Sequence, residues 1–464
     1  MTSTNITLVT PPSCFADSRA AQTEQLVQET VTMEVMNIKL WEKLPSEIVE
    51  RTLSSLAPPE LCRFRTVCKR WNYLICTPDF RFLCMQNARQ DACFLVARYM
   101  IRGEGLEEPY SGSFDKYHGW SFLDLNSRRW YTIKQDGQEV FDYFNIASGV
   151  AMEGGLVCQI LDTEDEDEFP EILVSNPIAR VSRILPPPPC PCYTDISELN
   201  IVVNNPGRNF KVLVMPNDSA LKRAGSPFLV VYEWASNQWR CSSFPSMPEM
   251  SHPHINIVVK CSVFLGDETL YILTSAAGGC GTEDFLLWCY NHVEDTWIDT
   301  GVSFTRMERI CPQLLVSDNQ LFLATWWRPS HALYLPSGDA APQWSYDIYK
   351  INLEDTTLDR VFHMTGEAMK HIFEMPAPQV NLDQGCRTQA FGLRAFGVGK
   401  SIVLICEPEM GKYNSGVAIV YDRSTSSWDL LPKNPLIPFD SKSRLNKLWY
   451  RKPMNLFLPL NSLW

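Results

Sequence analysis

The sequence predicts a small all-helical unit followed by an all-β repeat domain with the architecture of a propeller. Three observations lead to this prediction. Apolar residues recur at helical spacing over residues 40–85. From residue 91 onward, short β-branched and aromatic runs are split by Gly, Pro, Asn and Asp, and one motif repeats along this second part. The 464 residues, of which 45% are hydrophobic, are sufficient for one small domain and one large repeat domain.

Residues 40–85 have the pattern of two helices separated by prolines. Pro45 suits the first turn of a helix, because its missing N–H has no partner there. The apolar residues of the first helix are Ile48, Val49, Leu53 and Leu56, and those of the second are Leu61, Phe64, Val67, Cys68, Trp71, Leu74 and Ile75. So small a unit cannot bury all these side chains, and we expect the next domain or a partner to cover some of them.

The motifs of this unit occur in a defined order. A Leu44-Pro45 start is followed by a helix, a proline break and the segment Val67-Cys68-Lys69-Arg70-Trp71. In this order and spacing, residues 40–85 resemble an F-box over its whole length; the alternative is an ordinary helical hairpin with an internal core only. The resemblance implies docking on a Skp1-like adaptor, which bridges to a cullin that carries a RING protein. It assigns adaptor-facing or core positions to Leu44, Pro45, Ile48, Leu61, Val67 and Cys68.

Basic residues gather on the second predicted helix. They are Arg63, Arg65, Lys69 and Arg70. Such a cluster is either a solvated face or a surface that steers an acidic partner.

One motif recurs after residue 90: an apolar residue, then Asp, Glu or Asn, then five residues, then Trp. Its four full copies end at Trp130, Trp239, Trp297 and Trp428, and two weaker copies end at Leu358 and Ser182. We interpret each copy as a hairpin, in which a strand ends at the polar residue and the Trp begins the return strand. We expect the Trp residues to be structural spacers that pack between neighbouring sheets.

The six copies predict a six-bladed propeller over residues 91–464, with five or seven blades as alternatives. Further strand-like runs precede several copies, which gives each repeat the four strands of a blade. A ring of blades closes when a strand from one terminus joins a blade from the other. The candidates for this closing pair are residues 94–97 and 455–458.

The spacing of the copies is near or above the roughly 50-residue kelch period. Together with the segment from Gly154 to Cys158 and the Asn176-Pro177 turn, the copies resemble the kelch repeats that follow an F-box in plant proteins. The paired glycines and aromatics of a full kelch repeat are incomplete in most copies, and a divergent F-box-associated β-domain is the alternative. The resemblance implies a substrate-recognition subunit of a Skp1-cullin-F-box ubiquitin ligase, whose propeller binds the protein to be ubiquitinated.

Charge and composition restrict the partners and the location. The net charge of -12 and the pI of about 5.2 argue against a nucleic-acid partner, and no apolar stretch predicts a membrane span. Residues 1–36 are polar and predict a disordered tail without a secretory signal. We therefore interpret the 16 cysteines as reduced thiols and expect the cytoplasm or the nucleus.

No combination of residues predicts a catalytic site, a metal site or a cofactor. No Cys-x-x-Cys pair is present, and the glycine-rich residues 278–281 lack a phosphate-binding Lys-Ser/Thr. A ligase subunit needs no chemistry of its own, because it can act by holding a target close to an enzyme. The alternatives are a propeller enzyme or a small-molecule sensor. Contributors to an enzyme site would be the segment Trp326-Trp327-Arg328 with His331, His363 and His371.

We expect the target protein to bind loops at one face of the propeller, since loops carry specificity on a rigid scaffold. Our candidates for target contacts are Trp326, Trp327 and Arg328, because aromatic and Arg side chains often anchor interfaces.

Overall fold

The structure of the protein is a computed structural model. It describes residues 44–56, 58–75, 77, 79–80, 83–84, 94–101, 117–125, 128–134, 150–153, 156–161, 171–176, 181–189, 196–204, 209–216, 228–242, 256–266, 268–277, 283–305, 309–327, 345–373, 393–406, 417–432 and 445–454. The tail expected over residues 1–36 lies outside the described residues. By internal contacts the chain divides into two compact units, Met1–Thr52 and Leu53–Trp464.

Three short helices occupy the region predicted to be helical: α3 (Ser46–Ser54), α4 (Pro58–Phe64) and α5 (Lys69–Ile75). The carbonyl of Pro45 accepts hydrogen bonds from the Ile48 and Val49 amides, at 3.1 and 3.2 Å, and so begins α3.

The prediction of one continuous second helix is wrong, because the chain turns between α4 and α5. The Thr66 hydroxyl donates to the Arg63 carbonyl at 2.7 Å, and the Val67 amide donates to the Phe64 carbonyl at 3.1 Å. A side chain that bonds the local backbone competes with the helical hydrogen-bond pattern. The Trp71 amide then donates to Cys68 Sγ at 3.4 Å as α5 begins.

The described strands of the second part form six four-stranded antiparallel sheets, numbered here in chain order. Sheet 1 contains β1 (Phe94–Ile101), β2 (Tyr117–Asp124), β3 (Arg129–Lys134) and β24 (Leu445–Met454). Sheet 2 contains β4 (Val150–Glu153), β5 (Leu156–Leu161), β6 (Glu171–Asn176) and β7 (Val181–Ile184). Sheet 3 contains β8 (Ile196–Asn204), β9 (Asn209–Pro216), β10 (Leu229–Glu233) and β11 (Gln238–Ser242).

The remaining three sheets follow the same plan. Sheet 4 contains β12 (Asn256–Leu265), β13 (Thr269–Ala277), β14 (Glu283–Asn291) and β15 (Thr296–Thr305). Sheet 5 contains β16 (Arg309–Ser317), β17 (Gln320–Trp327), β18 (Ser345–Asn352) and β19 (Thr357–Thr365). Sheet 6 contains β20 (Leu393–Val398), β21 (Ser401–Cys406), β22 (Ala418–Asp422) and β23 (Ser427–Leu430), and helix α9 (Gly366–Phe373) connects sheets 5 and 6.

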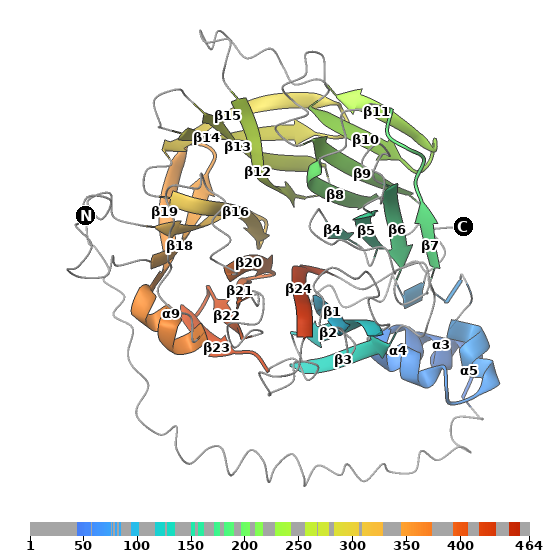
Figure 1. Ribbon diagram of the computed structural model, residues 1–464. Coiled ribbons are helices and arrows are strands. Elements are labelled where there is room, and N and C mark those ends of the chain that lie inside the picture. The colour runs from blue at the N-terminus through green and yellow to red at the C-terminus, as the bar shows by residue number, and fades with distance from the viewer. Residues whose placement is uncertain are drawn as a thin grey trace, which may run out of the picture. The chain divides into compact units, whose positions relative to one another are not determined.

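The sheets follow one another around a ring, as Figure 1 shows. One edge strand of each sheet lies innermost. These six strands neighbour one another in the cyclic order β4, β8, β12, β16, β20, β24 and again β4. This arrangement is a β-propeller.

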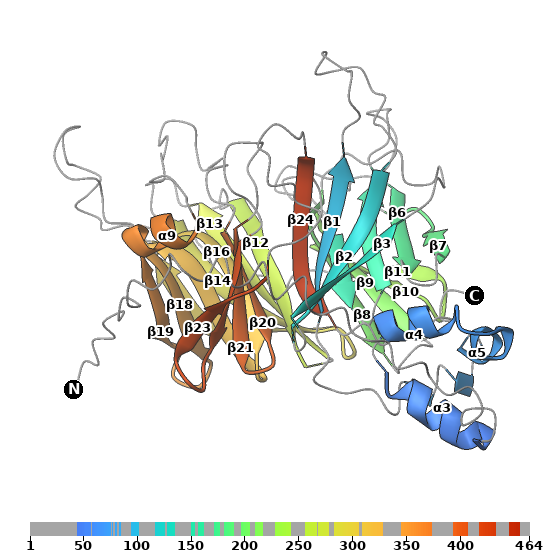
Figure 2. The ribbon, with the colours of Figure 1, turned by 90° about the horizontal axis from the view of Figure 1, so that it is seen from below.

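A strand from the C-terminal end of the chain completes sheet 1. Strand β24 pairs antiparallel with β1, so that Arg98 lies opposite Trp449 and Ile101 opposite Leu445 (Figure 2). One predicted partner, residues 94–97, is part of β1. The other, residues 455–458, lies outside the described residues, and the pairing strand is the segment that directly precedes it.

The hairpins predicted from the repeated motif are confirmed in register. In each copy the first residue lies directly opposite the residue seven positions later. The pairs are Leu123 with Trp130, Ser175 with Ser182, Tyr232 with Trp239, Tyr290 with Trp297, Ile351 with Leu358 and Tyr421 with Trp428.

A left-handed backbone conformation closes five of these hairpins, two residues before the end of the motif. The residues and their φ angles are Arg128 (55°), Asn237 (53°), Asp295 (56°), Thr356 (57°) and Ser426 (52°). A four-residue loop that ends in this conformation matches the twist of the two strands that it joins.

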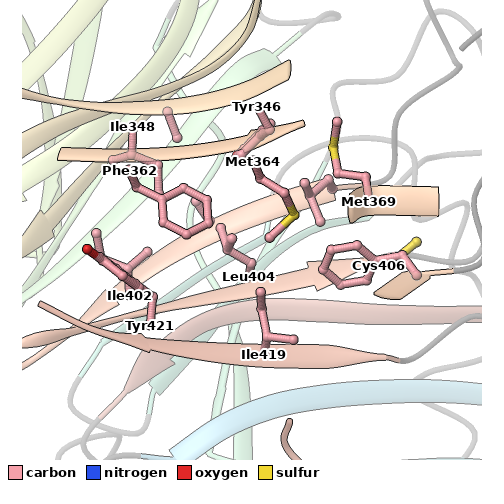
Figure 3. Packing of buried hydrophobic residues seen from close by; sticks show 14 of the residues in the cluster. Tyr346, Ile348, Phe362, Met364, Met369, Ile402, Leu404, Cys406, Ile419 and Tyr421 are labelled. Carbon is pink, nitrogen blue, oxygen red and sulfur yellow. The ribbon is translucent and has the colours of Figure 1, made fainter. Parts of the chain in front are cut away.

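The core of the propeller is a series of apolar layers between consecutive sheets. Figure 3 shows the layer between sheets 5 and 6, where Tyr346 and Phe362 face Leu404 and Tyr421. Met369 of α9 is 2% exposed and covers the edge of this layer. Central strands between two such layers are buried without alternation, as in β5, where every residue is buried, including the polar Gln159.

The innermost strands of sheets 5 and 6 approach so closely that only glycine fits at one position. A Cβ atom on Gly397 of β20 would lie 1.8 Å from the carbonyl oxygen of Val316 in β16. Beside this contact, Gln313 Nε2 donates to the Leu393 carbonyl at 3.1 Å, and the Ala395 amide donates to Gln313 Oε1 at 3.0 Å. The side chain of Gln313 thus links the two strands as a backbone amide would.

We predict that Gly397→Ala destabilises the propeller by about 4 kcal/mol or more, because the obstacle is backbone and cannot rotate away. Gly266→Ala is the control: its Cβ would contact nothing within 4 Å, although its φ is +70°. That variant should lose only about 1 kcal/mol. Urea denaturation of both variants checks the prediction, and equal losses would contradict the close approach.

Candidate functional site

The residues predicted to face an adaptor differ in exposure. In and before α3, Leu44 is half-buried, Pro45 is exposed and Ile48 is 48% exposed, whereas Val49 and Leu53 are buried. Helix α3 therefore has both a buried apolar side and an exposed apolar residue. Exposed apolar side chains on so small an element indicate a surface that contacts another molecule.

The second group of predicted residues lies in α4 and in the turn before α5. Leu61 is half-buried, Val67 is 56% exposed and Cys68 is exposed. Trp71 is 7% exposed and packs on Phe64, with 5.3 Å between the ring centroids, so it belongs to the internal core of the unit. The break between α4 and α5 removes Val67 from the helical pattern and leaves its side chain at the surface.

Tyr73 is an exposed residue that the sequence analysis did not single out. Its side chain is 76% exposed, the largest fraction among the described exposed apolar and aromatic residues. Its exposure could have been predicted from its position on α5, because it lies off the helical stripe defined by the buried Trp71 and Ile75.

The Trp residues of the repeated motif lie at the seams between sheets. Each of three indole Nε1–H groups donates to the end of the preceding sheet in the ring. Trp239 bonds the Pro186 carbonyl at 2.7 Å, Trp297 bonds Ser242 Oγ at 3.1 Å, and Trp130 bonds the Pro432 carbonyl at 2.7 Å. Trp428 is partly buried against the layer between sheets 5 and 6.

The Trp130 bond joins the first sheet to the last. At the same seam, Arg128 forms an ion pair with Asp429 at 2.5 Å. The ring is therefore closed by outer contacts as well as by the inner strand β24.

The seam between sheets 3 and 4 contains a charged network. Arg240 of β11 lies 2.7 Å from Asp295 Oδ1, and the Tyr290 hydroxyl donates to the same oxygen at 2.6 Å. Burial opposes the charged form of Asp295, but these two hydrogen bonds outweigh it and lower the pKa of the carboxyl. Burial and the neighbouring carboxylate raise the pKa of Tyr290 to about 12.

The predicted target contacts do not form a described surface. Trp326 is 1% exposed and packs edge-on against Tyr346, with 5.3 Å between the ring centroids. It belongs to the core between sheets 5 and 6 and offers no surface to a target. The side chain of Trp327 and all of Arg328 lie outside the described residues.

Sheet 5 also contains a buried acidic residue, Asp347, which lies opposite Thr325. Asp347 is 1% exposed; His363 Nδ1 lies 2.6 Å from its Oδ1, and the Ser345 hydroxyl donates to Oδ2 at 3.0 Å. The contact with Asp347 fixes the orientation of the His363 ring, although the His363 side chain is 41% exposed. His371 is exposed on α9, and His331 lies outside the described residues.

The connections of the propeller are unequal at the two edges of the sheets. At one edge the hairpins are tight, as at residues 154–155, 234–237 and 318–319. The other edge has most of the longer connections, among them residues 102–116, 328–344 and 366–392. The chain enters β1 at Phe94, opposite Asp124, and so at the edge of the tight turns.

The residues that the structure describes include neither a metal site nor a membrane-spanning helix. No group of three His, Cys, Asp or Glu side chains among them could hold a metal ion. Within the same ranges, no helix has the length and apolar character required to span a membrane.

The comparisons with known proteins agree with the helical motifs. Residues 41–83 match the sequence model of the F-box domain. The chain therefore carries an F-box domain, followed by a β-propeller.

Relatives in Arabidopsis thaliana are distant and matched in part. An F-box/kelch-repeat protein is 30% identical over 179 residues, which cover 37% of this chain and 38% of that protein. The protein UNUSUAL FLORAL ORGANS is 31% identical over 163 residues, which cover 33% of each chain. The chain thus spans little more than a third of these relatives. Among solved structures, the β-propeller domain of a Pyrococcus furiosus protease has a TM-score of 0.35 and 10% identity, covering 74% of this chain and 86% of that one.

We predict that Asp295→Asn weakens the propeller at neutral pH but not in acid. A carboxyl with a lowered pKa stabilises the fold above its ordinary pKa, and this stabilisation is lost as the pH falls through the folded value. The expected loss is about 1 kcal/mol at pH 7, because the side chain is half-exposed. Thermal melts at pH 7 and pH 3 measure it.

Glu294→Gln is the control for this prediction, since it removes a carboxylate from the same turn and no side-chain contact of Glu294 is described. A loss for Asp295→Asn that is equal at both pH values would contradict the assignment.

Proposed function

We propose that the protein is the substrate receptor of a Skp1-cullin-F-box ubiquitin ligase. The observation that carries this proposal is the F-box match at residues 41–83, together with exposed apolar side chains at Ile48 and Val67. On this proposal the F-box docks a Skp1-like adaptor, and through it a cullin-RING core. The adaptor covers apolar surface that the helical unit leaves open.

We further propose that the six sheets are six kelch-type blades of one closed propeller. The cyclic order of the innermost strands and the pairing of β24 with β1 support this count. The kelch type is supported by the repeated outer hairpins and by the partial match to an F-box/kelch-repeat protein.

We place the target protein at the sheet edges joined by the longer connections. The tight turns at the other edge leave little variable chain for recognition, and the chain enters β1 at that edge. The protein contributes no catalytic group and no cofactor in this role, because the ubiquitin-loaded enzyme is held elsewhere in the complex.

We also place the protein in the cytoplasm or the nucleus, where thiols remain reduced. The cysteines that the structure describes are free, including the exposed Cys68 and Cys241.

Adaptor capture tests the proposed function directly. The full chain and a version without residues 40–85 are each mixed with a purified Skp1-like adaptor, and complexes are separated by size. Binding by the full chain that is lost with the deletion supports the receptor role. An intact, folded chain that fails to bind the adaptor removes the ligase proposal and returns attention to a propeller enzyme or sensor.

We predict that Val67→Asp lowers adaptor affinity at least tenfold without unfolding the protein, because the side chain is exposed and makes no part of the core. Val49→Asp is the matched control. Val49 is 2% exposed, so the same substitution there buries a charge and unfolds the helical unit. Calorimetric titration and circular dichroism separate the two effects; unchanged affinity of the Val67 variant would exclude this residue from the interface.

A further inference from the structure

The exposed side of helix α5 is basic and aromatic. Trp71 and Ile75 are buried, whereas Lys69, Arg70 and Tyr73 are exposed. Lys69 and Arg70 precede Tyr73 by four and three residues, so their side chains neighbour it on one face of the helix. We name Arg65, Lys69, Arg70 and Tyr73 the α5 face.

Arg65 is held in place on this face. Its Nε–H donates to Asn72 Oδ1 at 3.0 Å, which ties the turn between α4 and α5 to the exposed side of α5. Among the residues that the structure describes, neither Lys69 nor Arg70 has an ion-pair partner. Their charge is therefore available to another molecule.

The charge of the α5 face is opposite to that of the whole chain. The protein has 53 acidic and 41 basic residues, yet no Asp or Glu occurs between Leu61 and Pro78, where four cations lie. An acidic partner is repelled by the chain as a whole and attracted at this face. Such a field selects the direction of approach and raises the association rate.

We propose that the α5 face binds an acidic segment of the adaptor and orients it before the apolar contacts form. This proposal rests on the proposed function. Lys69 and Arg70 supply the steering charge, and Tyr73 supplies apolar contact area with a hydroxyl at its tip, a combination common at the centres of interfaces.

Association kinetics of the full chain with a purified Skp1-like adaptor, at low and high salt, test the proposal. Lys69→Glu/Arg70→Glu should lower the association rate at low salt about tenfold and flatten its salt dependence, with little change in dissociation. Tyr73→Ala should instead speed dissociation about fivefold or more.

The matched control is Arg129→Glu/Arg360→Glu, which makes the same change in net charge at exposed positions of β3 and β19. The control should change the association rate much less.

Equal effects of the two double variants, or no effect of either, would overturn the inference while leaving adaptor binding intact. Failure of the wild-type chain to bind the adaptor at either salt would overturn the proposed function. An oligonucleotide that binds the wild-type chain but not Lys69→Glu/Arg70→Glu, with unchanged adaptor kinetics, would show a nucleic-acid contact instead.

Discussion

The pairing of β24 with β1 is the constraint on which the propeller depends. One of the described apolar layers lies between sheets 6 and 1, so it forms only when the ring is closed. Strand β24 also lies beside both β20 and β4, and it thereby completes the cyclic order of innermost strands. A single antiparallel pair thus makes sheets from opposite ends of the chain interdependent. The outer contacts of Trp130 and Arg128 with the end of sheet 6 reinforce the same seam.

The outer hairpins could be predicted from the sequence because their signal is local and repeated. A strand end, a polar turn and a Trp lie within eight residues, and the same spacing fixes the same register each time. The left-handed residue could not be predicted in this way, since Arg, Asn, Asp, Thr and Ser occupy that position in place of glycine. The sequence analysis placed the closing strand at residues 455–458, which are more apolar. The strand that pairs with β1 is 445–454, which contains Lys and Arg.

Trp326 shows how a sequence can mislead about a site. A Trp-Trp-Arg segment has the composition of an interface, but Trp326 lies in β17, where each of residues 321–326 is buried. Composition alone could not distinguish an interface anchor from a core residue, because both are large and aromatic. In the helical unit the same ambiguity was resolved by the turn at Thr66, which interrupts the helical pattern and leaves Val67 exposed.

The direction of the chain gives the proposed receptor a geometry. Because β1 begins at the edge of the tight turns, the chain enters sheet 1 at the edge opposite the longer connections. In the proposed role, a rigid closed ring increases the effective concentration of the target near the enzyme, since a bound target keeps less conformational freedom. Closure of the ring at sheet 1, where the chain enters the propeller, therefore stabilises the fold and would limit that freedom in the proposed role.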